Sequence, residues 1–261
     1  MTIDNTWKLD AIHIDPAGLN VLLTQVEQRT IAAELQEFVG RPAGAPNVHF
    51  RAIMTIEGKI TFSSTQVKTL LGLFGNNGGI CDLPADVYFK KAQCVGSDRT
   101  AAVHKKLTAQ ESILSWESME LPNSDSNSVA SMSCTFAPVF DGTNPLYTVS
   151  NNVACPGVLG FDEAYVMGPL WLKTAGTDMG LVNGTQKVTI NNNPQYKAKF
   201  AGGEARPSAA HVESFEPMID VETLSAVNYF TIPEDGLCLD DTAGGMLLFA
   251  QRVEPCKTGS L

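Results

Sequence analysis

The sequence predicts a mainly β protein in which many short strands are accompanied by one or two short helices. Its 261 residues include 22 Gly and 14 Pro, which cluster with Asn and Ser between short apolar runs. Gly and Asn tolerate positive φ and Pro presets φ, so such clusters are typical of the turns of a β-rich chain. A hydrophobic content of 44% argues against a wholly disordered chain.

Apolar and polar residues alternate along several segments, as they do in half-buried strands. Thr55–Phe62 and Ser131–Phe136 both show this alternation. Thr185–Asn191 also alternates, directly after Asn183–Gly184, a dipeptide suited to a type I′ hairpin turn. The apolar run Met246–Val253 is compatible with a strand in the core. We expect a strand in each of these segments.

The apolar phase changes within the opening segment. Trp7, Leu9 and Ala11 share one phase, whereas Ile12 and Ile14 share the other. A change of phase by one residue predicts a β-bulge in the first strand.

One helix is predicted over Thr65–Phe74, where apolar residues recur at i, i+3, i+4 and i+7: Val67, Leu70, Leu71 and Phe74. Ser63 or Ser64 can cap its first amides, and Gly75 can end it in the left-handed conformation. Burying each of the four side chains contributes roughly 1.5–3 kcal/mol before entropy, so we expect the helix to cover a sheet. Leu71→Asp is therefore expected to cripple folding.

The segment Thr30–Val39 fits two patterns. A helix ending at Gly40-Arg41-Pro42 is indicated by Ile31, Leu35 and Phe38, and a strand is nearly matched by Ile31, Ala33, Leu35 and Val39. We expect a helix here.

The whole chain, 1–261, is expected to form a single β-rich domain with extended loops. Four segments have the composition of flexible loops: Arg41–Pro46, Asn76–Gly79, Pro122–Ser128 and Ala201–Pro207. None is long enough or charged enough to require a domain boundary, and no convincing internal repeat is present.

The negative charge of the chain is unevenly distributed. The net charge is −10, and the segment Glu204–Asp241 holds nine acids against Arg206 alone, so it carries −8 of that total. Repulsion and the lack of a basic stripe argue against tight nucleic-acid binding. Solvated acidic loops are the plain alternative explanation of this segment.

Six cysteines are sparse for a chain of this length: Cys81, Cys94, Cys134, Cys155, Cys238 and Cys256. There is no CxxC motif and no Cys/His cluster with zinc spacing. We expect reduced thiols, several of them buried as small hydrophobic side chains. Disulfides in an oxidising compartment are the alternative.

No membrane segment or signal peptide is expected. The opening residues lack a basic start followed by an apolar stretch. The charge-free stretch Gly142–Phe161 contains Pro145, Pro156 and several Asn residues, and a bilayer would leave such a backbone unsatisfied.

The sequence predicts no catalytic, cofactor or metal site. There is no G-x-S-x-G nucleophile motif, and Gly75–Gly79 lacks the Lys-Ser/Thr pair of a phosphate-binding loop. His104-Lys105-Lys106 is interpreted as a solvated basic patch, and the four histidines are scattered: His13, His49, His104 and His211. Asp235, Asp240 and Asp241 could touch a calcium ion but lack the alternating ligands of an EF-hand.

The segment Phe215–Glu222 has an apolar face and an acidic face. Phe215, Pro217, Ile219 and Val221 share one face, and the other holds Glu216, Met218, Asp220 and Glu222. Such a strand suits a sheet that packs on a core and lines an aqueous, negative surface. Pro217 has no N–H, so the strand should begin there or lie at a sheet edge.

The order of several motifs resembles the layout of the tail-tube (major tail) proteins of long-tailed bacteriophages. After an opening strand with Trp7 come Phe38–Pro42, Ile60–Val67, Phe140–Pro145, Glu163–Pro169 and Val182–Ile190. The resemblance covers most of the chain.

The resemblance implies a β-sandwich or barrel-like fold with a flanking helix. Six copies would form a ring, their strands would join into an inner β-barrel, and rings would stack head to tail into a DNA-conducting tube. Its partners would be itself and other virion tail proteins, with no membrane, and the subunit would be made in the host cytoplasm for the virion tail. No catalytic residue or cofactor comes with this family.

The lumen of such tubes is usually acidic, which makes Glu216, Asp220 and Glu222 candidate lumen-facing residues. DNA phosphates would then be repelled weakly, with no Lys or Arg on that face to hold them. The alternative is an acidic strand on an outer surface.

Three other functions stay open. The chain could be another virion component, such as a distal tail, decoration or connector protein. It could be a β-sandwich that binds carbohydrate or another protein, although only three Trp and five Tyr are spread along it. The third is an enzyme whose site has no recognisable pattern.

Overall fold

The computed structural model describes residues 7–15, 21–24, 26–40, 48–75, 77–81, 83–91, 103–124, 126, 128–140, 142–156, 164–173, 180–181, 183–199, 207–224 and 245–253. Over 27–57, 91, 172–173, 180–181, 245–249 and 251–252 the backbone alone is described. Across these residues the protein is mainly β with one short helix, as the sequence predicts. The single domain over 1–261 stays a prediction.

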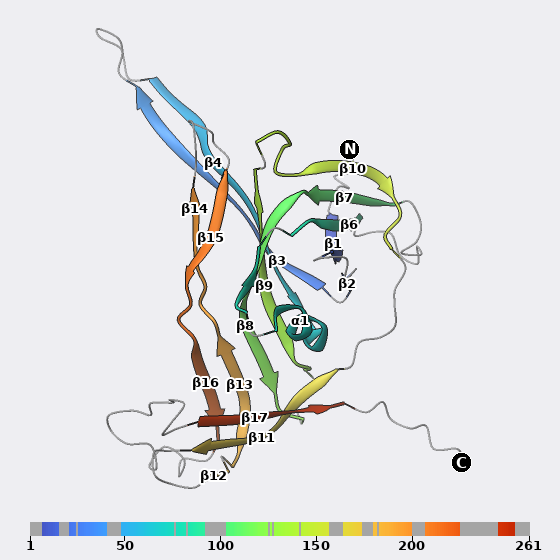
Figure 1. The fold of residues 1–261 in the computed structure, drawn as a ribbon, viewed down its shortest axis with the longest axis vertical. Coiled ribbons are helices and arrows are strands. Elements are labelled where there is room, and N and C mark those ends of the chain that lie inside the picture. The colour runs from blue at the N-terminus through green and yellow to red at the C-terminus, as the bar shows by residue number, and fades with distance from the viewer. Residues whose placement is uncertain are drawn as a thin grey trace.

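Two antiparallel sheets form a sandwich-like body (Figure 1). The five-stranded sheet has the order β10-β7-β6-β1-β2 and consists of β1 (Trp7–Ile14), β2 (Val21–Leu23), β6 (Ala85–Lys91), β7 (His104–Ala109) and β10 (Thr148–Val153). The seven-stranded sheet has the order β16-β13-β8-β9-β4-β3, with β5 beside β8; its strands are β3 (Val26–Gly40), β4 (Val48–Ser64), β5 (Gly79–Ile80), β8 (Glu111–Pro122), β9 (Ser131–Val139), β13 (Thr185–Asn191) and β16 (Met218–Thr223).

Smaller elements complete the body. A three-stranded sheet is formed by β11 (Tyr165–Lys173), β12 (Gly180–Leu181) and β17 (Gly245–Arg252), and it crosses the lower end of the seven-stranded sheet in Figure 1. A separate hairpin is formed by β14 (Gln195–Lys199) and β15 (Ala209–Ser214). No helix in the described part of the chain is long and apolar enough to cross a membrane.

One buried cluster joins the two main sheets and the helix α1 (Val67–Phe74). The five-stranded sheet contributes Ile12, Ile14, Leu23 and Val87, and the seven-stranded sheet contributes Phe62, Leu114, Met132, Cys134, Phe136 and Val188, all fully buried. Removing this much apolar surface from water is the main stabilisation of the fold. The predicted alternation of Ser131–Phe136 is confirmed, because its three apolar side chains all lie in this cluster.

The predicted bulge in the first strand is confirmed, one residue earlier than the apolar phase indicates. The register between β1 and β6 shifts between Leu9 and Ala11. Leu9 and Ile12 consequently face the main core, whereas Ala11 is buried on the opposite face against Tyr88 and Cys155.

The predicted strands at Thr185–Asn191 and Met246–Val253 are present as β13 and β17. Gly184 has a φ of 73°, as a turn requires, but Asn183 has no positive φ. The segments flanking this turn also belong to different sheets, since β12 pairs with β11 and β13 pairs with β8 and β16. The turn is therefore a passage between sheets and not a type I′ hairpin.

The predicted helix is present as α1, but its buried stripe is narrower than expected. Val67, Leu70 and Phe74 are buried, whereas Leu71 is 44% exposed. Successive helical residues are about 100° apart, so Leu71 lies at the rim when Leu70 faces the core. The expectation that Leu71 is buried is therefore wrong, and the loss of folding predicted for Leu71→Asp no longer has that basis.

The ends of α1 also differ from the prediction. Gln66 is the N-cap and makes no side-chain cap bond, while the hydroxyl of Ser64 accepts a hydrogen bond from the Gln66 N–H at 3.1 Å. Gly75 ends the helix with a φ of 55°, and its N–H donates to the Leu71 carbonyl at 2.8 Å. Its ψ of −123° lies outside the left-handed helical region.

The expectation of a helix over Thr30–Val39 is wrong: the segment lies within β3. This strand pairs antiparallel with β4 along its length, with Ile31 opposite Ile60 and Phe38 opposite Phe50. A helix of ten residues is marginal in water, whereas pairing with β4 satisfies the backbone groups on one side of the segment.

The outer parts of β3 and β4 leave the sheet as a two-stranded ribbon. In the described part, β4 pairs with β9 only over Ile60–Ser64, and beyond that β3 and β4 pair with each other. Gly58 marks the exit with a φ of 61°, and the Tyr147 hydroxyl donates to its carbonyl at 2.8 Å. Figure 1 shows the ribbon projecting from the body. We call its strands, 32–40 and 48–57, the arm.

The chain from β13 to β16 forms a long hairpin whose pairing is interrupted between its β13/β16 part and its β14/β15 part, and we call this interruption the bend. At the bend, the N–H of the buried Asn192 donates to the Glu117 carbonyl at 2.7 Å, and the Glu216 N–H donates to the Asn192 carbonyl at 3.2 Å. Asn193 has a φ of 43°, and Phe215 lies against Gly78. Above the bend, β14 reaches β4, where the Lys59 ammonium lies 4.1 Å from the ring centre of Tyr196.

Candidate functional site

The end of the seven-stranded sheet formed by β16, β13 and β8 has one polar face. Thr189 of β13 lies opposite both Glu120 of β8 and Asp220 of β16, and Lys187 lies opposite Glu222. Side chains alternate between the two faces along each strand, so residues that lie opposite one another on the three strands point to the same face. We call the surface of Glu120, Lys187, Thr189, Asp220 and Glu222 the acidic face.

The opposite face of the same strands is apolar. Leu121 and Val188 lie in the main core with Val221 packed beside them, and Met119, Ile190 and Ile219 form a second row packed against it. The predicted two-faced pattern of β16 is thus present, with Ile219 and Val221 half-buried and the acids exposed.

The residues that precede β16 depart from this pattern. Phe215 and Pro217 were expected on the apolar face, but both are exposed and lie outside the strand. Glu216 is also exposed and lies at the bend, so it is not part of the acidic face. Of the three candidate lumen residues, Asp220 and Glu222 therefore lie together and Glu216 stands apart.

Lys187 partly neutralises the negative charge of the acidic face. The Lys187 ammonium lies 3.4 Å from a Glu120 carboxylate oxygen, and the Asn191 amide donates to Asp220 at 2.8 Å. The expectation that this face carries no Lys or Arg is therefore wrong. Three carboxylates against one ammonium still leave a net charge of −2, and partial exposure keeps the ion pair weak.

Both lateral ends of the seven-stranded sheet are strand edges. Among the described residues, β16 pairs with β13 alone and β3 pairs with β4 alone. An edge strand presents unpaired N–H and C=O groups that another chain can satisfy. The acidic face therefore lies directly beside an edge able to pair with a second strand.

A buried polar network lies on the outer face of the five-stranded sheet. His104 is fully buried, and its Nε2 lies 3.0 Å from a carboxylate oxygen of Asp10, the bulge residue of β1. Its Nδ1 has no hydrogen-bond partner. Beside it, the Lys106 ammonium binds Asp86 at 3.2 Å. The interpretation of His104-Lys105-Lys106 as a solvated basic patch is therefore wrong.

Packing explains this burial. Tyr88 meets the His104 ring edge-on with centroids 6.4 Å apart, and Cys155 and Val153 pack on the same small cluster. Burial, and then the Asp86 carboxylate, raise the pKa of the Tyr88 hydroxyl well above its usual range. No local sequence pattern indicates this network, because its residues come from separate strands.

Three of the six cysteines lie in the described part, and all three are thiols: Cys81 is exposed, and Cys134 and Cys155 are buried. Burial, and then the nearby Glu117 carboxylate, raise the pKa of Cys134 far above its usual range. These positions agree with the expectation of reduced thiols. Cys94, Cys238 and Cys256 lie outside the described residues.

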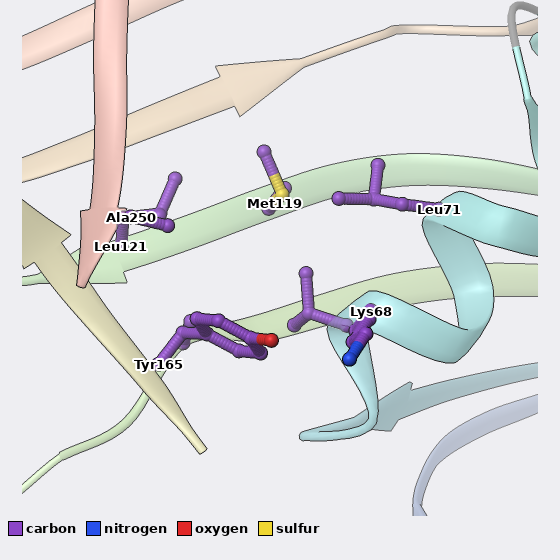
Figure 2. Close-up of a pocket in the computed structure, with 8 residues that line it drawn as sticks. Lys68, Leu71, Met119, Leu121, Tyr165 and Ala250 are labelled. Atoms are coloured by element: carbon purple, nitrogen blue, oxygen red, sulfur yellow. The ribbon is translucent and has the colours of Figure 1, made fainter. Parts of the chain in front are cut away.

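An apolar groove opens where α1 meets the lower end of the body. Its volume is about 330 Å³, and its lining comes from α1, β8, β11, β17 and the residue before β9: Val67, Lys68, Leu71, Met119, Leu121, Ala130, Tyr165 and Ala250. Figure 2 shows Leu71 and Met119 on one side, with Tyr165 and Lys68 across from them. We call this surface the groove. No single segment of the sequence indicates it, because five parts of the chain contribute.

The described residues bring no three His, Cys, Asp or Glu side chains close enough to hold a metal ion. The candidate calcium ligands Asp235, Asp240 and Asp241 lie outside those residues. No protein-family model and no curated protein matches the chain. The described features that bear on function are therefore surfaces: two sheet edges, the acidic face, the projecting arm and the groove.

Proposed function

We propose that this chain is a structural subunit that polymerises with its own copies and has no catalytic role. Its specific role would be that of the phage tail-tube protein, whose sequence layout it resembles. Rings of subunits stack into a tube of the virion tail, and DNA passes through the lumen without being held.

The observation that carries this proposal is that one sheet ends in two strands that each pair with a single neighbour among the described residues. β16 and β3 lie at opposite ends of the same seven-stranded sheet. An edge at each end lets one copy pair with the next head to tail, and such a contact repeats until the ring closes. The edge groups left unpaired in one copy are then satisfied by its neighbours.

The acidic face supports a lumen. Asp220 and Glu222 lie on β16 and share their face with Glu120 and Lys187. If the sheet lines a ring, this net negative surface repeats with every copy. Phosphates would be repelled at each repeat, while the one lysine is already engaged by Glu120. A channel of that kind lets DNA slide.

Charge reversal tests this function directly. The double variant Asp220→Lys with Glu222→Lys keeps the apolar face of β16 and changes the acidic face by four charges. Tubes of the variant should keep their outer shape and retain DNA, so that particles carrying them deliver their genome poorly. The ion pairs gained with phosphate weaken with added salt, and so should the retention.

A matched control makes the same charge change elsewhere. Glu111→Lys with Glu213→Lys alters two exposed acids that lie outside the acidic face. These tubes should release DNA as wild type does. Normal infectivity from intact particles of the Asp220/Glu222 variant would show that these carboxylates do not line the channel.

A further inference from the structure

The five-stranded sheet ends at β10, which pairs with β7 alone among the described residues. Figure 1 shows β10 as the outermost strand of that sheet. Residues 148–151 contain neither Pro nor Lys, the residues that edge strands commonly use to prevent pairing. Asn152 has a φ of 54°, and the register with β7 shifts there, so the regular part of the strand ends at Asn151. We call residues 148–151 the β10 edge.

An apolar row crosses the core-facing side of this sheet and ends at the β10 edge. Leu23, Ile12 and Val87 lie opposite one another on three neighbouring strands and are fully buried. The row continues through the half-buried Leu107 of β7 to Val149 of β10, which is 59% exposed. An apolar side chain beside Val149 on an added strand would extend the row and remove this surface from water.

The same sheet is basic, although the chain as a whole is acidic. Its strands contain five lysines and two aspartates, a charge of +3 in a chain of −10: Lys8, Lys90, Lys91, Lys105 and Lys106 against Asp10 and Asp86. Lys8 and Lys90 lie directly opposite each other on the outer face, where like charges repel. On that face Ser150 of the β10 edge lies opposite Lys106. A carboxylate beside Ser150 on an added strand would therefore enter a positive field.

We propose that the β10 edge binds an extended segment of another protein in which apolar residues alternate with acidic ones. The segment adds as a further strand, and its backbone pairs with the outward N–H and C=O groups of residues 148–151. Successive side chains of a strand point to opposite faces, so one segment places its apolar residues beside Val149 and its acids beside Ser150. This contact goes beyond the copy-to-copy contacts of the proposed function and does not depend on them.

Two synthetic peptides test the pattern. In the Val/Glu peptide valine alternates with glutamate, and in the matched Val/Lys peptide it alternates with lysine. Fluorescence anisotropy with the whole protein at low salt measures the Kd of each. The Val/Glu peptide should bind at least about tenfold more tightly, because only its charges are opposite to those of the sheet. Added salt should weaken its binding.

Strand addition is tested separately from charge. A Val/Glu peptide whose backbone nitrogens are all methylated keeps its side chains and its charges but has no N–H to donate. Its binding should be lost, because a peptide that adds to a sheet is held by main-chain hydrogen bonds. Undiminished binding of the methylated peptide would refute strand addition.

A pair of protein variants tests the position. Val149→Glu ends the apolar row in a like charge and should raise the Kd of the Val/Glu peptide at least about tenfold, since burial of one Val is worth about that factor. Met218→Glu is the matched control, because Met218 is 56% exposed and also lies on an edge strand, β16. This variant should bind the peptide as wild type does. Circular dichroism checks that both variants are folded.

Several results would overturn the proposal. They are no binding of the Val/Glu peptide, equally tight binding of the Val/Lys peptide, and equal losses in the two protein variants. Loss of self-association in folded Val149→Glu would show that a second copy, and not another protein, fills the β10 edge. Self-association of that variant equal to wild type, together with loss of peptide binding, is the expected result.

Discussion

The two adjacent leucines of α1 offer a test of how the helix packs. Leu70 has no exposed surface and belongs to the main core, whereas Leu71 is 44% exposed at the groove. Leu70→Ala and Leu71→Ala make the same chemical change one residue apart in the same helix. Helix propensity therefore changes equally in both variants, and the difference between them reports packing alone.

The structure sets the expected magnitudes. A buried Leu→Ala change leaves a cavity and costs about 2–5 kcal/mol, so Leu70→Ala should lower the unfolding free energy by about 3 kcal/mol. Leu71 keeps nearly half its surface in water, and its truncation should cost about 1 kcal/mol, since full burial of Leu contributes only about 1.5–3 kcal/mol. For a domain of this size the larger loss corresponds to about 6–12 °C in Tm.

Urea unfolding followed by tryptophan fluorescence measures both values, at low salt so that self-association does not add stability. Equal losses in the two variants, or a greater loss in Leu71→Ala, would refute the orientation of α1.

Three further measurements address other parts of the structure. Thiol titration of unfolded, freshly purified protein should find at least four free cysteines. In the folded protein Cys81 should react, and Cys134 and Cys155 should react only after unfolding. No free thiol at all would imply disulfides and an oxidising compartment. Gly78→Ala would bring a Cβ within 2.3 Å of the Phe215 ring, so it should lower the unfolding free energy by about 1 kcal/mol. In a Phe215→Ala background the same change should cost nothing, because the ring is gone. Strictly additive effects of the two substitutions would show that the residues do not touch. Stability should fall as pH rises past 9 to 10, because Cys134 and Tyr88 hold their protons more tightly when folded than at their ordinary pKa values of 9.0 and 10.0; a flat profile there would contradict their burial.

Much of the sheet structure could be predicted because alternation is a local property. Met132, Cys134 and Phe136 alternate with hydroxyl residues, and their burial follows from a period of two. The phase change between Ala11 and Ile12 likewise indicated a bulge, although the bulged residue is Asp10, beside His104. Ile219 and Val221 face inward for the same reason.

The misjudged features depend on neighbours that a local pattern does not show. Thr30–Val39 fits both periods, and only pairing with β4 makes it a strand. His104 is polar and followed by two lysines, yet it is fully buried beside the Tyr88 ring of another strand. Lys187 enters the acidic face from another strand, and the groove gathers side chains from residues 67 to 250.

Electron microscopy of the purified protein at raised ionic strength tests the assembly proposal most directly. Screening of a net charge of −10 should weaken repulsion between copies, so rings or stacked tubes are expected to become more abundant as salt is added. Their walls should contain continuous sheets with the acidic face toward the bore. Monomers at every ionic strength and concentration tested, with neither rings nor tubes, would contradict the proposal.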